Sequence, residues 1–278
     1  MTIAVTAANG KLGSEIIKAL SRLGTHSVVG LARTPAKAQH EGVEIRKGDY
    51  NSQIDLEQSL RSIRTVLLVS GMDEPAKRIE QHRNVIRAAR NAGVRKIVYT
   101  SVQGAETGNA FSPIVQSNRQ TEQDVRDSDL DWVIGRNGIY IEPDVDCIDA
   151  YKKAGCIANC AGDRKCGYTT RPELAYAYAR MLTEDEHNGQ TYNLHGEALT
   201  QAQLASHLNR AFDTNLIYRK MTVEEYRRER VAELGEFLGG MIAGIYAGIR
   251  EGAMDNPSQY IKVADREHKL WGDYFAGI

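Results

Sequence analysis

The chain of 278 residues is long enough for one large α/β domain, or for a domain of about 150 residues with a smaller one attached. Its 35 Lys and Arg residues nearly balance its 36 Asp and Glu residues, and a net charge of -1 provides no general attraction to nucleic acid. No basic segment followed by a long apolar run opens the chain, and no stretch approaches the roughly 20 apolar residues of a membrane span. We therefore expect a soluble, cytoplasmic protein that binds neither nucleic acid nor membranes directly.

The first 136 residues alternate short apolar runs with helical patterns. Between the first two runs, Leu12, Ile16 and Leu20 recur at helical spacing, and Gly24 stands where that helix would end. The predicted strands are residues 3–6, 26–32, 43–47, 65–70, 96–101 and 131–136. Strands separated by helices in this way predict a Rossmann-type, doubly wound parallel sheet of the α/β class.

After Tyr140 the pattern changes to longer helices with few strands. Pro172 suits the first turn of a helix, and the pairs Thr200 with Gln203 and Thr222 with Glu225 have capping-box spacing. We expect a dinucleotide-binding domain over residues 1–140 and a smaller, mostly helical domain over 141–278, some segments of which return to the sheet. A ligand cleft would lie between them, at the carboxyl ends of the strands.

Residues 239–248, "GGMIAGIYAG", place Gly240, Gly244 and Gly248 four residues apart. This small-xxx-small pattern also occurs in pairs of membrane helices, but charged residues flank the short apolar run. The pattern favours a close-packed helix over the substrate cleft.

The four cysteines are Cys147, Cys156, Cys160 and Cys166. They form no C-x2-C pair, and the histidines provide no H-x3-H partner. We expect reduced structural thiols and no metal site.

The stretch "VTAANGKLG" resembles a phosphate-binding loop between a strand that ends at Thr6 and a helix that begins near Lys11. Gly10 and Gly13 provide close approach of the backbone to a pyrophosphate. Ala7 occupies the place of the first glycine, and its effect depends on the backbone angle φ at that residue.

Arg33 and Lys37 follow the second predicted strand in "VVGLARTPAK". Sites specific for NAD usually carry an Asp or Glu there to bind the ribose 2′-OH. Two cations would instead pair with a 2′-phosphate, and the predicted cofactor is therefore NADPH.

Several further segments resemble those of the NmrA-like, atypical short-chain dehydrogenases, a family that includes bacterial quinone and triphenylmethane reductases. The resemblance rests on "TAANGKLG", "LARTPAKA", "GDYN" (48–51), "QHRNVIRAARNAGVRKIVYTS" (81–101), "TEQDV" (121–125), "RNGIY" (136–140), "TTRPELAYAYARMLTE" (169–184) and "YNLHG" (192–196). These segments span most of the chain, and their order is specific to the family.

The resemblance implies roles for individual residues. Thr6, Gly10, Lys11, Leu12 and Gly13 would form the phosphate loop, Arg33 and Lys37 would contact the 2′-phosphate, and Asp49 and Tyr50 would lie near the adenine. Ser70 and Gly71 would lie near the ribose and pyrophosphate, and Thr100, Ser101, Asn137 and Tyr140 would border the nicotinamide and the substrate. The last residues, "HKLWGDYFAGI", depart from this family.

Carbonyl-reducing short-chain dehydrogenases use a Tyr and a Lys four residues later for proton transfer. The corresponding positions here are Ile114 and Asn118, which cannot perform this chemistry. Catalytic residues are therefore unassigned, and Tyr140 is either a weak proton donor or a pocket-lining aromatic. We expect His82 to be a packed or surface helix residue and Glu122 to form a cap or an ion pair.

Two functions remain open. One is an NADPH-dependent reductase that passes hydride directly to a quinone or a similar electrophilic conjugated molecule, which needs no strong protein acid. The other is a non-catalytic NADP(H) redox sensor. A sugar-nucleotide epimerase would need the missing Tyr and Lys, and a homodimer is compatible with the sequence.

Overall fold

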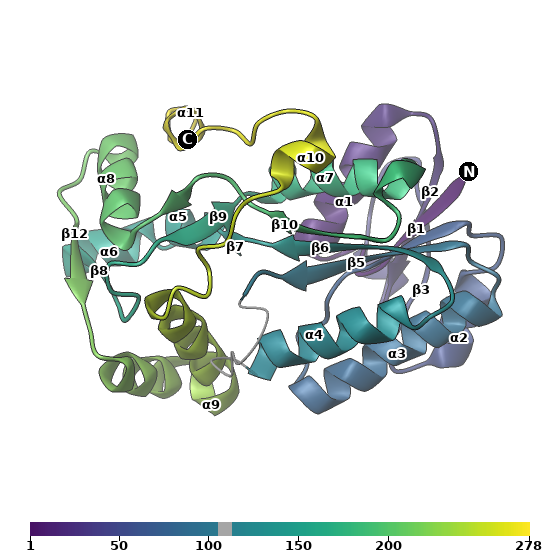
Figure 1. Cartoon of the computed structure of the whole chain (residues 1–278), viewed down its shortest axis with the longest axis horizontal. Helices are drawn as coiled ribbons and strands as arrows, with labels where there is room; N and C mark the ends of the chain where they lie inside the picture. The colour runs from purple at the N-terminus through teal and green to yellow at the C-terminus, as the bar shows by residue number, and fades with distance from the viewer. Residues whose placement is uncertain (105–112) are drawn as a thin grey trace.

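The computed structural model describes residues 1–104 and 113–278, and a parallel sheet forms its centre (Figure 1). Within these residues the sheet has seven strands in the order β10-β6-β5-β4-β1-β2-β3, and each neighbouring pair is parallel. The strands are β1 (Thr2–Val5), β2 (Ser27–Ala32), β3 (Glu44–Lys47), β4 (Thr65–Leu68), β5 (Lys96–Val102), β6 (Asp131–Asn137) and β10 (Gln190–Leu194). The strand order reverses between β1 and β4, which confirms the predicted doubly wound Rossmann-type sheet.

Helices cover both faces of this sheet (Figure 1). One face carries α1 (Lys11–Leu23), α7 (Arg171–Thr183) and α10 (Tyr260–Ala264), and the other carries α2 (Gln53–Ser59), α3 (Pro75–Asn91) and α4 (Pro113–Arg126). Each layer encloses its own apolar core: Ile16, Leu67 and Leu174 belong to the first, and Leu56, Val85 and Ile97 to the second. Strands that are buried on both faces, such as β4 and β5, read as continuous apolar runs, which is why the sequence predicted them well, whereas the residues of the edge strand β3 are exposed or half-buried.

The seventh strand, β10, lies far along the chain and pairs with β6 from Gln190 opposite Val133 to Leu194 opposite Asn137. It follows α7, which packs against α1, and a short 3-10 helix, η2 (Asp185–His187). Residues 171–194 therefore return to the large sheet, with α7 on one face and β10 at the edge, and the carboxyl end of β10 lies beside the carboxyl end of β6.

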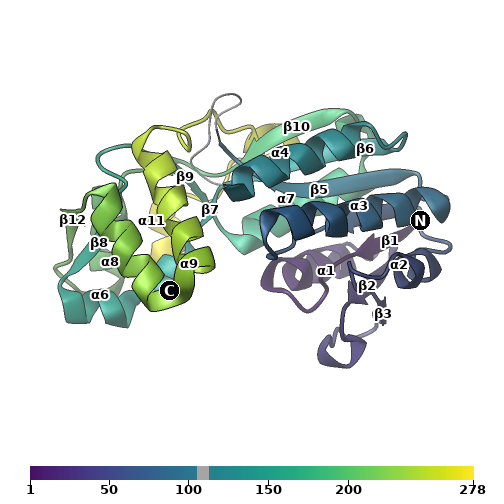
Figure 2. The same cartoon turned by 90° about the horizontal axis from the view of Figure 1, so that it is seen from below.

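The remaining elements form a smaller region beside the carboxyl ends of the strands (Figure 2). Its strands form a three-stranded sheet, β11-β9-β7, and a parallel pair, β12-β8. The elements are β7 (Ile139–Tyr140), α5 (Glu142–Asp146), α6 (Ile148–Ala154), β8 (Cys156–Asn159), β9 (Cys166–Thr169), β11 (Ala198–Leu199), α8 (Gln201–Phe212), β12 (Ile217–Lys220), α9 (Val223–Arg250) and α11 (Trp271–Phe275). Both predicted capping boxes are present, at Thr200 before α8 and at Thr222 before α9.

The α9 segment is two helices joined by a kink at Gly235, whose φ of 82° is in the left-handed region. The two halves approach each other closely, because a Cβ atom at Gly239 would collide with the backbone of Arg230. The sequence pattern singled out Gly240, Gly244 and Gly248, whereas this close approach of the backbones occurs at Gly239. In the part of the chain that the structure describes, no helix has both the length and the hydropathy to cross a bilayer.

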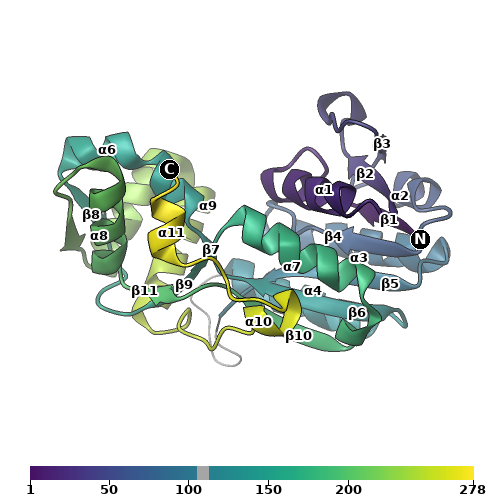
Figure 3. The ribbon, with the colours of Figure 1, turned by 90° about the horizontal axis from the view of Figure 1, so that it is seen from above.

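The last 20 or so residues connect the two regions (Figure 3). α10 packs against α7 and β10 of the large sheet, whereas α11 packs against α8 of the smaller region. The indole N–H of Trp271 donates to the carbonyl of Glu197 at 2.7 Å and secures the second contact. This segment therefore bridges both regions on one face of the molecule.

Candidate functional site

The turn between β1 and α1 places Ala7 in the left-handed region, with φ of 50°. The Gly10 N–H donates to the Ala7 carbonyl at 2.8 Å, and a Cβ at Gly13 would collide with the same carbonyl oxygen. Gly13 is therefore required by the close approach of the helix to the turn. Ala7 adopts an angle that glycine would adopt at lower cost, which answers the question that the sequence left open.

The N-terminus of α1 is free to bind an anion. Its cap residue is Gly10, which has no side chain to accept a bond from the first N–H groups of the helix. The first turn contains no acidic residue. Among the described residues, nothing accepts from the N–H groups of Lys11, Leu12 and Gly13. Unpaired N–H groups and the helix dipole both attract negative charge, so this end has the properties of a phosphate site.

Thr6 and Tyr50 connect the segments that follow β1, β3 and β4. The Thr6 hydroxyl lies 2.5 Å from the Tyr50 phenol and accepts from the Val69 N–H at 2.9 Å. The Tyr50 phenol donates to the Val69 carbonyl at 2.8 Å, and burial raises its pKa. Both hydroxyl groups are therefore occupied by protein partners. Asp49, which precedes Tyr50, is half-buried and accepts two bonds of 3.0 Å from Asn51.

Arg33 and Lys37 are exposed beside the carboxyl end of β2, Lys37 in the short helix η1 (Pro35–Lys37). In the described residues neither side chain has a hydrogen bond or a salt bridge. The Asp73 carboxylate is near Arg33. A hydrogen bond from Gln81 at 2.6 Å, the neighbouring Lys77 and the charge of Arg33 together lower the pKa of Asp73. Two cations are thus available where a 2′-phosphate would lie.

The residues after β4 are anchored to α3. The Gly71 N–H donates to His82 Nε2 at 3.0 Å, and His82 Nδ1 lies 2.9 Å from the Thr121 hydroxyl. Because Nε2 accepts a bond, Nδ1 carries the proton and donates to Thr121. Burial and the charge of Arg78 lower the pKa of His82 to about 3, so its ring is neutral. The Gly71 N–H therefore has a protein partner, and His82 is a packed helix residue, as expected.

A buried polar cluster lies directly behind Ser70. Arg78 Nη2 donates to the Ser70 hydroxyl at 2.6 Å and to Asn118 Oδ1 at 2.7 Å, and the Tyr99 phenol donates to the same Oδ1 at 2.6 Å. The Ser70 N–H donates to the Thr100 hydroxyl at 2.8 Å. Sequence reasoning did not identify Arg78 or Tyr99, because only the fold brings α3 and β5 to the end of β4.

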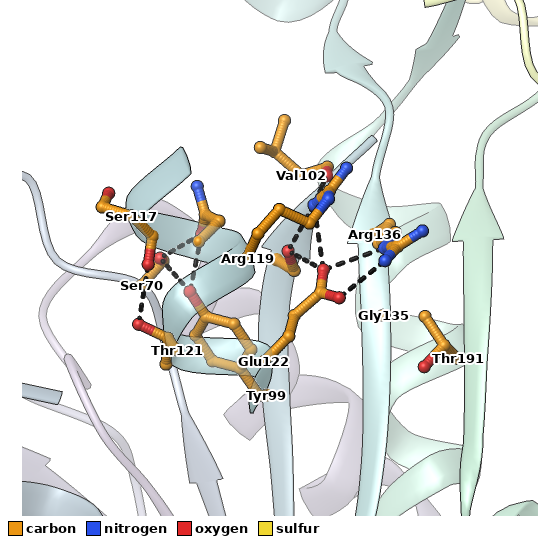
Figure 4. Close-up of polar contacts among 12 residues, drawn as sticks. Ser70, Tyr99, Val102, Ser117, Arg119, Thr121, Glu122, Gly135, Arg136 and Thr191 are labelled. Atoms are coloured by element: carbon orange, nitrogen blue, oxygen red, sulfur yellow. Dashed lines mark hydrogen bonds and ion pairs between the residues drawn. The ribbon is translucent and has the colours of Figure 1, made fainter. Parts of the chain in front are cut away.

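Glu122 forms the centre of a second buried cluster at the ends of β5 and β6 (Figure 4). Arg136 binds it through Nε at 2.8 Å and Nη2 at 2.6 Å, and Arg119 Nη1 donates to it at 2.9 Å. The Ser101 hydroxyl also donates to Glu122, at 2.7 Å. Burial alone would raise the pKa of Glu122, but the bonds from Arg136 and the charge of Arg119 bring it below its ordinary value. The expected ion-pairing role of Glu122 is confirmed.

Asn137 and Tyr140 lie side by side where β6 ends and β7 begins. The Tyr178 phenol donates to Asn137 Oδ1 at 2.6 Å, and Asn137 Nδ2 donates to the Tyr140 hydroxyl oxygen at 3.2 Å. The guanidinium of Arg171 lies 5.2 Å from the centre of the Tyr140 ring. Burial raises the pKa of Tyr140, so the phenol keeps its proton and can donate it in a hydrogen bond.

The two positions of the missing proton-transfer pair lie on the first turns of α4. Ile114 is half-buried, and its carbonyl accepts from Asn118 Nδ2 at 2.9 Å. Asn118 is buried and directs its oxygen toward Arg78 and Tyr99. Neither side chain provides a proton donor or a positive charge.

The four cysteines are free thiols, of which Cys156, Cys160 and Cys166 are buried. In the described residues, three potential metal-ligating side chains come together at Glu184, Glu186 and His187. Arg180 already binds the Glu184 carboxylate there at 2.8 Å.

The sheet order, the free N-terminus of α1 and the exposed cations after β2 define a dinucleotide-binding Rossmann protein. A family model described as NAD(P)H-binding matches residues 7–185. Quinone oxidoreductase 2 of Escherichia coli is 33% identical over 265 residues, which cover 92% of this chain and 91% of that protein. The chain therefore belongs to the NAD(P)H-binding, NmrA-like family of oxidoreductases, which confirms the resemblance found in the sequence.

Solved structures agree with this assignment. An NADPH-dependent quinone oxidoreductase from E. coli, complexed with NADPH, superposes with a TM-score of 0.90 at 31% identity and covers 99% of both chains. The triphenylmethane reductase of Citrobacter sp., complexed with NADP(H), has a TM-score of 0.90 at 30% identity and covers 100% of both chains. A nucleoside-diphosphate-sugar epimerase from Staphylococcus aureus, at 22% identity and a TM-score of 0.92, shares the fold.

Proposed function

We propose that this protein is an NADPH-dependent reductase that passes hydride directly to a quinone or a similar electrophilic conjugated molecule. The observation that carries the proposal is the combination of a free α1 N-terminus with Arg33 and Lys37, in a chain 33% identical to quinone oxidoreductase 2. NAD(P)H binding is the property of the family, and the preference for NADPH and the substrate class are our inference.

The residues present fit this cofactor. Gly13 lets α1 approach the turn closely, because a Cβ there would collide with the Ala7 carbonyl oxygen, and the first turn of α1 contains no acidic residue that would repel a phosphate. The unpaired N–H groups of Lys11 and Leu12 suit a pyrophosphate, and Arg33 suits a 2′-phosphate. Bound NADPH would provide the hydride and its two electrons.

The protein residues would then bind, orient and exclude water. We infer that Asn137 and Tyr140 border the acceptor, and that Tyr140 offers a hydrogen bond to an acceptor oxygen. A quinone needs no strong acid to accept hydride, which is compatible with Ile114 and Asn118 in place of the proton-transfer pair. We also infer that the smaller region covers the substrate, because β7 leads directly from Asn137 into it.

The test is steady-state oxidation of NADPH by the purified protein with a panel of quinones, followed by the loss of absorbance of the reduced cofactor. We expect turnover that depends on the quinone and that is faster with NADPH than with NADH. Tight NADPH binding without turnover of any quinone or dye would contradict the proposal and would favour the redox-sensor function. That function predicts a partner whose affinity differs between NADPH and NADP⁺.

A further inference from the structure

Arg78, on α3, is a buried cation whose hydrogen bonds all go to neutral groups. Only 2% of the residue is exposed. Nη1 donates to the Ser117 hydroxyl at 3.0 Å and to the Ile114 carbonyl at 3.4 Å, and Nη2 donates to Ser70 and Asn118. In the two stretches of chain that the structure describes, no carboxylate pairs with this guanidinium.

The ionisable groups nearest to Arg78 do not balance its charge. Burial raises the pKa of Tyr99 and keeps its phenol neutral. His82 is neutral because burial and Arg78 itself lower its pKa to about 3. A guanidinium does not lose its proton in a protein, so one positive charge remains uncompensated in a low-dielectric environment. Such a charge is costly to bury, and its field extends further than it would in water.

The position of this charge relates it to the candidate site. Arg78 contacts Ser70 at the end of β4 and Asn118 on α4, and Asn118 occupies the position of the missing lysine. Ser70 in turn donates through its backbone to Thr100 at the end of β5. The proton-transfer pair would have placed a lysine on α4. Here Arg78 on α3 provides a positive charge instead, in contact with Ser70 and Asn118.

We propose that Arg78 gives the site a fixed positive charge that selects neutral acceptors, which become anions when they accept hydride, over acceptors that are already cations. This inference rests on the proposed reductase function and specifies its substrate class.

The selectivity follows from the charge change of each acceptor. A neutral quinone takes hydride from NADPH, which is oxidised to NADP⁺ as its C–H bond breaks and a new bond to the quinone forms. The quinone becomes a hydroquinone monoanion, which then takes a proton from water. The developing negative charge is stabilised by Arg78. A triphenylmethane dye is a cation that becomes neutral on hydride uptake, so Arg78 opposes its approach and stabilises no product charge.

Three variants separate charge from structure. Arg78→Gln removes the charge, Arg78→Lys keeps it, and Ser117→Asp leaves Arg78 in place but adds a carboxylate beside Nη1. Arg90→Gln is the matched control, because Arg90 lies on the same helix and is paired with Asp129 at the surface. We expect Arg78→Gln and Ser117→Asp to lower kcat/KM for a neutral quinone by about tenfold relative to a cationic dye. Arg78→Lys and Arg90→Gln should keep the wild-type ratio.

A binding measurement tests the same charge without turnover. 4-Nitrophenol is a neutral phenol that ionises to a coloured phenolate, and its absorbance can be titrated in the complex of the protein with NADP⁺. We expect the pKa of the bound probe to lie below its value in water in the wild-type protein. We expect it to rise by about one unit in Arg78→Gln and in Ser117→Asp, which is the same tenfold effect.

The outcomes distinguish the two proposals. If the wild-type protein reduces quinones but the quinone-to-dye ratio is unchanged in both charge-altering variants, the role of Arg78 is wrong and the reductase function stands. If the wild-type protein reduces nothing, the reductase function is wrong, and the nitrophenol titration decides the role of Arg78. No preference of the wild-type protein for the phenolate over the phenol would overturn that role. If Arg78→Gln does not fold, Ser117→Asp provides both readouts.

Discussion

The phenol of Tyr178 on α7 donates a hydrogen bond of 2.6 Å to the amide oxygen of Asn137 at the end of β6. This bond fixes the direction of the Asn137 amide and turns its NH₂ group toward Tyr140. Tyr178 can reach Asn137 because residue 135 is glycine. A Cβ atom at this position would collide with the phenol of Tyr178. The side chains that we place next to the acceptor are therefore oriented by a residue of α7, a helix that packs on one face of the sheet.

Removing the Tyr178 hydroxyl tests this arrangement. In Tyr178→Phe the Asn137 amide loses its anchor, and Tyr140 loses a defined donor. We expect kcat/KM for a quinone to fall about fivefold to tenfold, with an unchanged Kd for NADPH and about 1 kcal/mol less stability. The measurements are steady-state kinetics, cofactor titration and denaturant unfolding. Tyr192→Phe, in which the lost hydroxyl is bonded to His187, is the control, and an equal kinetic loss there would contradict the prediction.

Ala7 provides a second prediction, because its φ of 50° is costly for any residue with a Cβ. Ala7→Gly should raise the free energy of unfolding by about 1 kcal/mol and increase the affinity for NADPH. Calorimetry and cofactor titration provide the two values. Ala8→Gly is the control, because Ala8 is buried and its φ is not positive. This variant loses a buried methyl group without relief of strain, so its free energy of unfolding should fall. An unchanged or weaker NADPH affinity in Ala7→Gly would show that the methyl group does not disturb the turn.

The third prediction concerns cofactor choice. Arg33→Ala should weaken NADPH binding by about tenfold to a hundredfold, since a charge-assisted bond to the 2′-phosphate is lost, and should leave NADH binding nearly unchanged. Lys37→Ala should have a smaller effect in the same direction. Titration of each variant with both cofactors provides the comparison. Equal losses for NADPH and NADH would mean that Arg33 does not recognise the 2′-phosphate.

The fourth prediction is the pH dependence due to His82. The folded pKa of His82 is about 3, whereas an unfolded histidine titrates near 6.5, so the unfolded chain binds one more proton between these values. The stability from His82 is therefore complete above pH 6.5 and declines as the pH falls, by about 1.4 kcal/mol per pH unit. In His82→Gln, whose amide oxygen can still accept from Gly71, this part of the slope should disappear. Unfolding free energies from pH 4 to 7 test it, and parallel curves for the two proteins would contradict it.

Part of the candidate site could be predicted from the sequence because it depends on residues that are close together in the chain. The phosphate loop and the cations after the second strand are each encoded within about ten consecutive residues, and the parallel strands are encoded as continuous apolar runs. The same local reading showed that Ile114 and Asn118 cannot transfer a proton.

Other residues could not be recognised because their partners are distant in the chain. Arg78 meets Ser117 and Asn118 across about 40 positions, and Tyr178 meets Asn137 across a similar separation. The strand β10 was missed because a five-residue strand that follows a helix has too little periodicity to be separated from its surroundings.

By itself the sequence determined the fold class through its periodicity, and its short motifs resembled one family and indicated a nicotinamide dinucleotide as the cofactor. Only the tertiary structure decided that Ala7 has a left-handed backbone, that Gly71 is held by a neutral histidine, and that Arg78 is buried without a counter-charge among the described residues. These are properties of contacts between segments. Burial, hydrogen bonds and neighbouring charges together shift the pKa of a side chain, and these surroundings exist only after the sheet and its helices have packed.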